Sequence, residues 1–142
     1  MRNCVIENRR EVVSVASKPE DLRERTKKFA LRIIRLFRAL PRGGDAQVIG
    51  KQLLHSGTSV AANYRAACRA RSRQEFAARI GIVMEEADET VFWLELISES
   101  GILPTPRLVP LLRESRELAA IFTASFGTAR KKRSITRPIT QS

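Results

Sequence analysis

The chain has 142 residues, of which 43% are apolar and 6% aromatic, and it carries a formal net charge of +11 at pH 7. This length suits one domain with a core of its own, and the scarcity of aromatic residues favours an all-α protein over a β-sandwich. No apolar run is long enough for a transmembrane helix, and charged residues near the N-terminus argue against a signal peptide. We therefore expect a cytoplasmic protein with no membrane contact.

The positive charge is unevenly distributed along the chain. Basic residues dominate positions 18–79 and 130–142, whereas positions 80–129 hold more acidic than basic side chains. A protein polarised in this way offers one surface to polyanions and another to basic partners.

The first helix is predicted over 19–40, because Pro19 suits a first helical turn and Pro41 cannot continue the pattern. Its core stripe follows steps of three and four: Leu22, Thr26, Phe29, Ile33, Leu36 and Leu40. Leu31 and Ile34 lie outside this stripe, so the helix has apolar surface beyond what one core requires.

The second helix is predicted over 46–70, with Asp45 as its N-cap. It contains a run of poor helix formers: Ser56, Gly57, Thr58 and Ser59. Since the apolar periodicity continues through this run, we interpret the small residues as a surface for close helix packing. The alternative interpretation is a break between two helices at Gly57.

The third helix is predicted over 73–100, between a capping box and Gly101. Ser72 is expected to accept a hydrogen bond from the Glu75 amide, and the Glu75 carboxylate to accept one from the Ser72 amide. The predicted core stripe is Phe76, Ile80, Val83, Ala87, Val91 and Leu94.

The third helix also carries a second stripe on another side: Ile82, Glu86, Glu89, Phe92, Trp93, Leu96 and Ile97. A helix in a single bundle needs one apolar stripe, so two stripes indicate a second partner. We expect this partner to be another copy of the chain, with Leu31 and Ile34 on its side of the interface and arginines that meet Glu86 and Glu89.

The fourth helix is predicted over 106–129 and is followed by a basic tail over 130–142. We expect this tail and an N-terminal arm over 1–18 to be disordered, because neither shows a sustained apolar period. The bundle domain then covers 19–129. Four long helices with short connections predict an all-α, up-down-up-down antiparallel four-helix bundle with left-handed packing.

Residues for catalysis or metal binding are not evident. A di-iron bundle requires Glu-x-x-His motifs, but the single histidine, His55, follows Gln52 at that spacing. Ser56 and Cys68 have no evident His base, and Cys4 and Cys68 show the spacing of neither a zinc site nor a disulfide framework. We therefore expect no catalytic residues, no metal, no cofactor and no small-molecule substrate.

Basic side chains suggest contact with RNA or DNA. The candidates are Arg25, Lys28, Arg32 and Arg35 on the first helix, Arg65, Arg69, Arg71 and Arg73 at the second junction, and Arg130, Lys131, Lys132 and Arg133 in the tail. Without interleaved aromatic residues such contact would be sensitive to salt and largely independent of base sequence. The alternative is that these residues provide solubility and pair with acidic side chains of a neighbouring subunit.

Several motifs occur together in this order: Arg25-Thr26-x-x-Phe29-Ala30, Leu40-Pro41, Gln52-Leu53-x-x-Ser56-x-Thr58-Ser59-Val60-x-Ala62-Asn63-Tyr64, Ser72-x-x-Glu75-Phe76, Glu86-Ala87-Asp88-Glu89 and Trp93-Leu94-Glu95-Leu96. In these motifs the chain resembles the bacterial four-helix bundle proteins, also called 23S rRNA-intervening-sequence proteins, over roughly residues 20–130. The resemblance implies an up-down four-helix bundle that commonly assembles as a homopentamer. It implies no catalytic residues.

Two functional hypotheses follow. The first is a non-enzymatic oligomeric bundle whose basic surface binds nucleic acid. The second is a protein-interaction scaffold, in which a polarised ring recruits a partner protein and nucleic acid plays no part.

Overall fold

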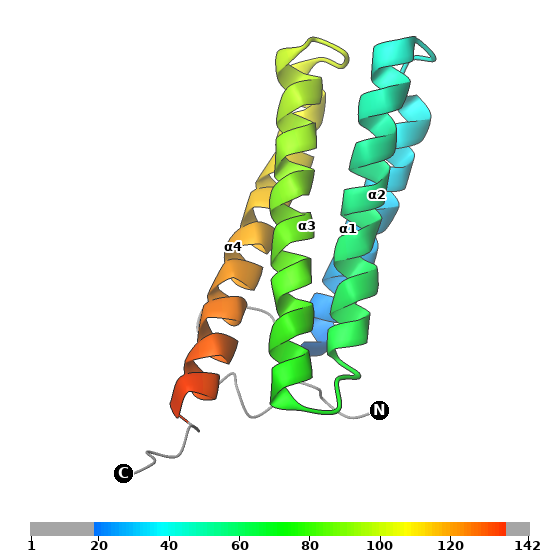
Figure 1. The fold of residues 1–142 in the computed structure, drawn as a ribbon. Helices are drawn as coiled ribbons and strands as arrows, with labels where there is room; N and C mark the ends of the chain where they lie inside the picture. The colour runs from blue at the N-terminus through cyan, green and yellow to red at the C-terminus, as the bar shows by residue number, and fades with distance from the viewer. Residues whose placement is uncertain (1–18, 136–142) are drawn as a thin grey trace, which may run out of the picture.

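Four antiparallel helices form the part of the chain that the structure describes, residues 19–135 (Figure 1). The structure is a computed structural model. The helices are α1 (Pro19–Ala39), α2 (Gly44–Ala67), α3 (Arg73–Glu99) and α4 (Thr105–Ile135). Each packs mainly on its neighbours in sequence, while α1 and α4 approach each other over a shorter stretch. The predicted all-α, up-down-up-down four-helix bundle is therefore confirmed.

The core follows the predicted stripes closely on α1. All six stripe residues of that helix are buried: Leu22, Thr26, Phe29, Ile33, Leu36 and Leu40. The Thr26 hydroxyl donates to the Leu22 carbonyl at 2.7 Å, so its burial leaves no unmet donor. Tyr64 and Phe122 join α2 to α4 in the centre, with ring centroids 5.3 Å apart. Each large apolar side chain buried in this way contributes about 1.5–3 kcal/mol.

Helix α2 runs without a break through Gly57, which rules out the alternative of two helices. A Cβ atom at Gly57 would lie 2.8 Å from Cγ1 of Ile33 on α1, closer than such atoms can approach. The neighbouring hydroxyls are satisfied locally, because Ser56 donates to the Leu53 carbonyl and Thr58 to the Leu54 carbonyl. The run of small residues thus allows α1 and α2 to pack closely, as predicted.

The two ends of α2 differ from the prediction. The helix begins at Gly44 with Gly43 as N-cap, so Asp45 lies in the first turn, where its carboxylate accepts from the Ala46 amide at 2.8 Å. Its acidic charge there still complements the helix dipole. At the other end, Arg69 and Ala70 donate to carbonyls three residues earlier, and this tight turn ends the regular helix at Ala67.

Cys68 corrects the expectation that the cysteines form no disulfide. It caps α2, lies half-buried against the core and is disulfide-bonded. The only other cysteine of the chain, Cys4, lies outside the described residues.

Helix α3 begins at the predicted capping box. The Ser72 hydroxyl accepts from the Glu75 amide at 3.0 Å. The Glu75 carboxylate, however, accepts from the amide of Arg71, one residue earlier than expected, at 3.0 Å. At the other end Gly101 adopts φ +77°, the left-handed conformation that ends helices.

The stripe assigned to the core of α3 is corrected at two positions. Thr90 is buried in place of the half-buried Val91, and its hydroxyl donates to the Glu86 carbonyl at 2.7 Å. Ile97 is fully buried in the core and does not belong to the outer stripe. The reason is spacing, since Thr90, Leu94 and Ile97 continue the steps of four and three from Ala87.

Helix α4 is longer than predicted. It begins at Thr105, contains Pro110 and continues to Ile135, beyond the predicted end at 129. The segment 130–135 is rich in arginine and lysine, which favour helix, and basic residues near a helix C-terminus are stabilised by the dipole. The rest of the predicted tail, 136–142, and the arm over 1–18 lie outside the described residues.

Candidate nucleic-acid interface and subunit surface

The fold brings basic residues from separate segments to one end of the bundle. Figure 1 shows the start of α1, the α2–α3 connection and the end of α4 at the same end. Six exposed basic side chains of α2, the connection, α3 and α4 define what we call the basic end: Arg65, Arg69, Arg71, Arg73, Arg130 and Lys131. Lys132 and Arg133 continue α4 there, although their side chains lie outside the described set.

The basic residues of α1 are placed differently. Lys28 and Arg35 are exposed, but they lie farther along α1, away from the basic end. Arg32 is half-buried, and its charge contributes to lowering the pKa of Glu114 on α4. These residues therefore do not form one cluster with the α2–α3 connection.

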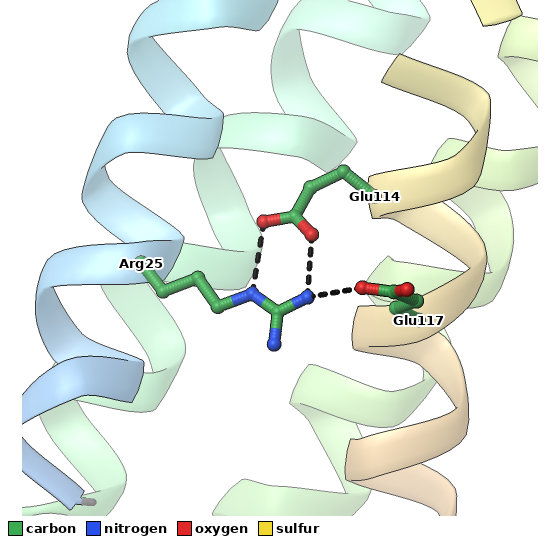
Figure 2. Close-up of polar contacts among 3 residues, drawn as sticks. All are labelled: Arg25, Glu114 and Glu117. Carbon is green, nitrogen blue, oxygen red and sulfur yellow. Dashed lines mark hydrogen bonds and ion pairs between the residues drawn. The ribbon is translucent and has the colours of Figure 1, made fainter. Parts of the chain in front are cut away.

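Arg25, one of the predicted nucleic-acid contacts, is ion-paired with two carboxylates of α4 (Figure 2). Its Nε donates to Glu114 Oε2 at 2.9 Å and its Nη2 to Glu114 Oε1 at 2.5 Å. The same Nη2 reaches Glu117 Oε2 at 2.6 Å. The hydrogen bonds to the two carboxylates, above all those to Glu114, raise the pKa of Arg25. The hydrogen bonds from Arg25 in turn lower the pKa of Glu114.

The Arg25–Glu114–Glu117 cluster joins α1 to α4, the pair of neighbouring helices that pack over the shorter stretch. Sequence analysis missed it because Arg25 shares helical spacing with other basic residues of α1. The signal that could have revealed it is the pair Glu114 and Glu117, which lie one turn apart on α4 and face the same side.

A groove between α1 and α2 is a second feature that sequence analysis missed. Its volume is about 590 Å³, and Arg23 and Lys27 of α1 and Arg65 of α2 line it together with the acidic Glu24. The remaining lining residues are small: Thr58, Ala61 and Ala62. Basic side chains on both helices therefore face a groove without bulky residues.

Exposed apolar side chains remain on α2 and α3. Phe92 is 50% exposed and Ile82 39%, while Trp93 and Leu96 are half-buried. We call these four residues, together with the 65% exposed Val48 of the antiparallel neighbour α2, the apolar strip. The Phe92 and Trp93 rings meet edge to face at 4.9 Å, and Trp93 Nε1 donates to Glu89 Oε1 at 3.1 Å. Sequence analysis did not include Val48.

Glu86 is the unusual acid beside the strip. It is half-buried, and its Oε2 atom is buried without a hydrogen-bond partner. Burial raises the pKa of Glu86, and the charges of Glu89 and Glu85 act in the same direction, while His55 of α2 opposes them. A half-buried carboxylate oxygen without a partner costs free energy and is well placed to accept a bond from another molecule.

On α1, Leu31 is 44% exposed and Ile34 half-buried. α1 and α3 are not packing neighbours in the bundle, so the two predicted halves of the subunit interface lie on different sides of one molecule.

The described residues also bear on metal binding and membrane insertion. No group of three or more His, Cys, Asp or Glu side chains within them is arranged to hold a metal ion. None of the helices that the structure describes combines the length and apolarity needed to cross a bilayer.

Fold and surface together define an all-α four-helix bundle protein with a basic end and an exposed apolar strip. The chain belongs to the family of 23S rRNA-intervening sequence proteins, whose profile matches residues 20–124, and this confirms the predicted resemblance. A crystal structure from Bacteroides thetaiotaomicron, described as a protein of unknown function from the S23 ribosomal protein family, is similar with a TM-score of 0.70. The two chains are 30% identical over 76% of this chain and 96% of the other. No curated protein matches the sequence.

Proposed function

We propose that this protein is a non-enzymatic, self-assembling bundle that binds nucleic acid through its basic end. The observation that carries the proposal is the gathering of exposed arginines and lysines from α2, the α2–α3 connection and α4 at one end of the molecule. Such a cluster neutralises several phosphates at once, and the release of counterions drives binding. The name of the family refers to rRNA, which is compatible with this partner.

Binding at the basic end is expected to depend on salt and to be largely independent of base sequence. No aromatic side chain belongs to the basic end, so stacking on bases does not contribute there. Arg130 makes an aromatic contact within the molecule, where its guanidinium lies 5.5 Å from the Phe126 ring centroid.

Two double variants with the same change of charge test this proposal. Arg69→Gln/Arg71→Gln removes two exposed charges from the basic end, and Arg38→Gln/Arg42→Gln removes two exposed charges from the opposite end. We expect the first variant to lose affinity for a generic RNA and the second to bind like the unmodified protein. Equal affinity of the two variants at low salt would contradict the assignment of the basic end.

We also infer that the apolar strip and the exposed apolar surface of α1 form the subunit interface of a homo-oligomer, a pentamer by family resemblance. Because the two surfaces lie on different sides of the molecule, each copy would contact one neighbour through α3 and another through α1. Such a head-to-tail arrangement forms a ring when the rotation between copies closes, as the family resemblance implies. The unpaired Glu86 beside the strip and the exposed Lys28 and Arg35 near Leu31 have complementary charges for such a contact.

The alternative function is a scaffold that recruits a partner protein through the polarised ring. The acidic residues in the middle and later turns of α3, which lie away from the basic end, support it because they offer a separate surface to a basic protein. Undetectable binding of RNA and DNA at low salt would favour this alternative.

A further inference from the structure

We propose that the groove between α1 and α2 holds the sugar-phosphate backbone of a single-stranded nucleic acid. This proposal rests on the proposed function, because it assumes that nucleic acid binds at the basic end. It adds the path that a strand would follow from there along the surface. The groove includes Arg65 of the basic end and extends along α1 to Arg23 and Lys27.

The charges of the groove favour a phosphodiester. Lys27 and Arg65 are exposed and stand on opposite sides, one on α1 and one on α2. Arg23 lies one helical turn from Lys27 on the same side, and Glu24 is the single acidic residue among those that line the groove. A strand lying between the two helices would therefore meet positive charge on both sides.

The shape of the groove selects a single strand. The axes of packed helices lie only about 8–10 Å apart, so the groove between α1 and α2 has room for one strand and not for a double helix with two backbones. The small Ala61 and Ala62 side chains allow a backbone to approach the helix surface closely. This is a second use of the small residues of α2, beside the close packing on α1 at Gly57.

The residues that line the groove also determine which part of the nucleic acid is recognised. None of the residues that line the groove is aromatic, so it cannot stack on bases, and the contact is to the phosphates. RNA and DNA single strands of the same sequence are therefore expected to bind alike, because the groove recognises the phosphodiester that they share.

The experiment measures binding of the full chain to a generic single-stranded RNA, to the same DNA sequence and to its duplex, as a function of salt. Lys27→Gln/Arg65→Gln should lower the magnitude of the salt slope for single strands by about 1.4 and weaken binding at least about tenfold at low salt. Glu24→Gln should strengthen single-strand binding, because it removes the acidic charge. A loss by the double variant no greater than that of Arg38→Gln/Arg42→Gln would overturn the proposal.

A second pair of variants tests the shape of the groove without changing charge. Ala62 is exposed on α2, and Ala62→Leu should fill the groove and weaken binding of single strands but not of the duplex. Ala120→Leu makes the same change at an exposed position of α4 and should leave the affinities for single strands and for the duplex unchanged. If these two variants bind single strands with the same affinity, the proposal that the groove holds the strand is wrong.

The results separate this inference from the proposed function. If the unmodified protein shows no salt-dependent binding to any probe, the proposed function and the inference about the groove are both wrong. If it binds and only Arg69→Gln/Arg71→Gln weakens binding, the basic end stands and the groove is wrong.

Discussion

Single side chains in this protein show how much the environment decides the role of a charge. Arg25 and Lys28 differ by one turn on α1, yet Arg25 is held by two carboxylates of α4 while Lys28 faces solvent. Glu86 and Glu114 are both half-buried carboxyls, and the pKa of Glu86 is raised by burial while that of Glu114 is lowered by the bonds from Arg25. The difference lies in their partners.

Glu114→Gln should destabilise the fold by about 1–2 kcal/mol at pH 7, because it weakens a partly buried, charge-assisted pair. Since the folded state lowers the pKa of Glu114, this contribution is present above the ordinary carboxyl pKa and is lost as pH falls through the lowered value. The difference between the two proteins should therefore shrink below about pH 4. Urea denaturation at several pH values measures it.

The matched control is Glu117→Gln, which removes the more exposed carboxylate from the same guanidinium. An exposed ion pair contributes about 1 kcal/mol or less, so this variant should lose less stability than Glu114→Gln. A larger loss for Glu117→Gln would contradict the geometry of the cluster.

Glu86→Gln should stabilise the isolated subunit by a few tenths to about 1 kcal/mol at neutral pH. The raised pKa means that the stability of the unmodified protein falls as pH rises through that pKa, so the advantage of the variant should disappear below about pH 4. Denaturation at concentrations too low for assembly tests this, with the exposed Glu85→Gln as control. Destabilisation by Glu86→Gln at neutral pH would show that Glu86 has a favourable partner within the subunit.

At the scale of the helices, the closeness of α1 and α2 depends on Gly57. Gly57→Ala places a methyl group against the buried Ile33 and should cost about 1–3 kcal/mol, even though alanine favours helix. Gly127→Ala on α4 meets nothing within 4 Å and should stabilise the protein by about 0.5–1 kcal/mol. Chemical denaturation gives both values, and equal effects at the two glycines would mean that Gly57 is not a packing contact.

The helices and most of their core were predictable from sequence because apolar residues at steps of three and four determine which face is buried. The prediction was wrong at Ile97, where several neighbouring apolar residues left the phase of the stripe ambiguous near the end of α3. Partners across helices were not predictable in this way. Nothing in the local pattern shows that Arg25 meets Glu114, or that Lys27 and Arg65 face one groove, because these contacts depend on how α1 lies against α4 and α2.

At the scale of the whole molecule, the apolar strip and the basic end lie on different parts of the surface. The strip runs along the outer faces of α2 and α3, while the basic end combines the α2–α3 connection with the end of α4. A protein organised in this way could assemble and bind a polyanion at the same time.

Self-assembly is tested by placing a charge in the apolar strip. Phe92→Glu should reduce the mass measured by light scattering to that of a single chain, because a carboxylate would be buried without a partner in the interface. Val109→Glu introduces the same charge at an exposed apolar position of α4 and should leave the mass unchanged. If Phe92→Glu keeps the mass of the unmodified protein, the strip is not the interface.

The central claim is that this molecule binds the nucleic-acid backbone through clustered positive charge, and the most direct measurement is its affinity for a generic single-stranded RNA across a salt series. We predict that the logarithm of the binding constant falls linearly with the logarithm of salt concentration, with a slope of about −2.8 or steeper, as neutralisation of about four or more phosphates on a single strand requires. Absence of binding at low salt, or an affinity that does not change with salt, would contradict the account.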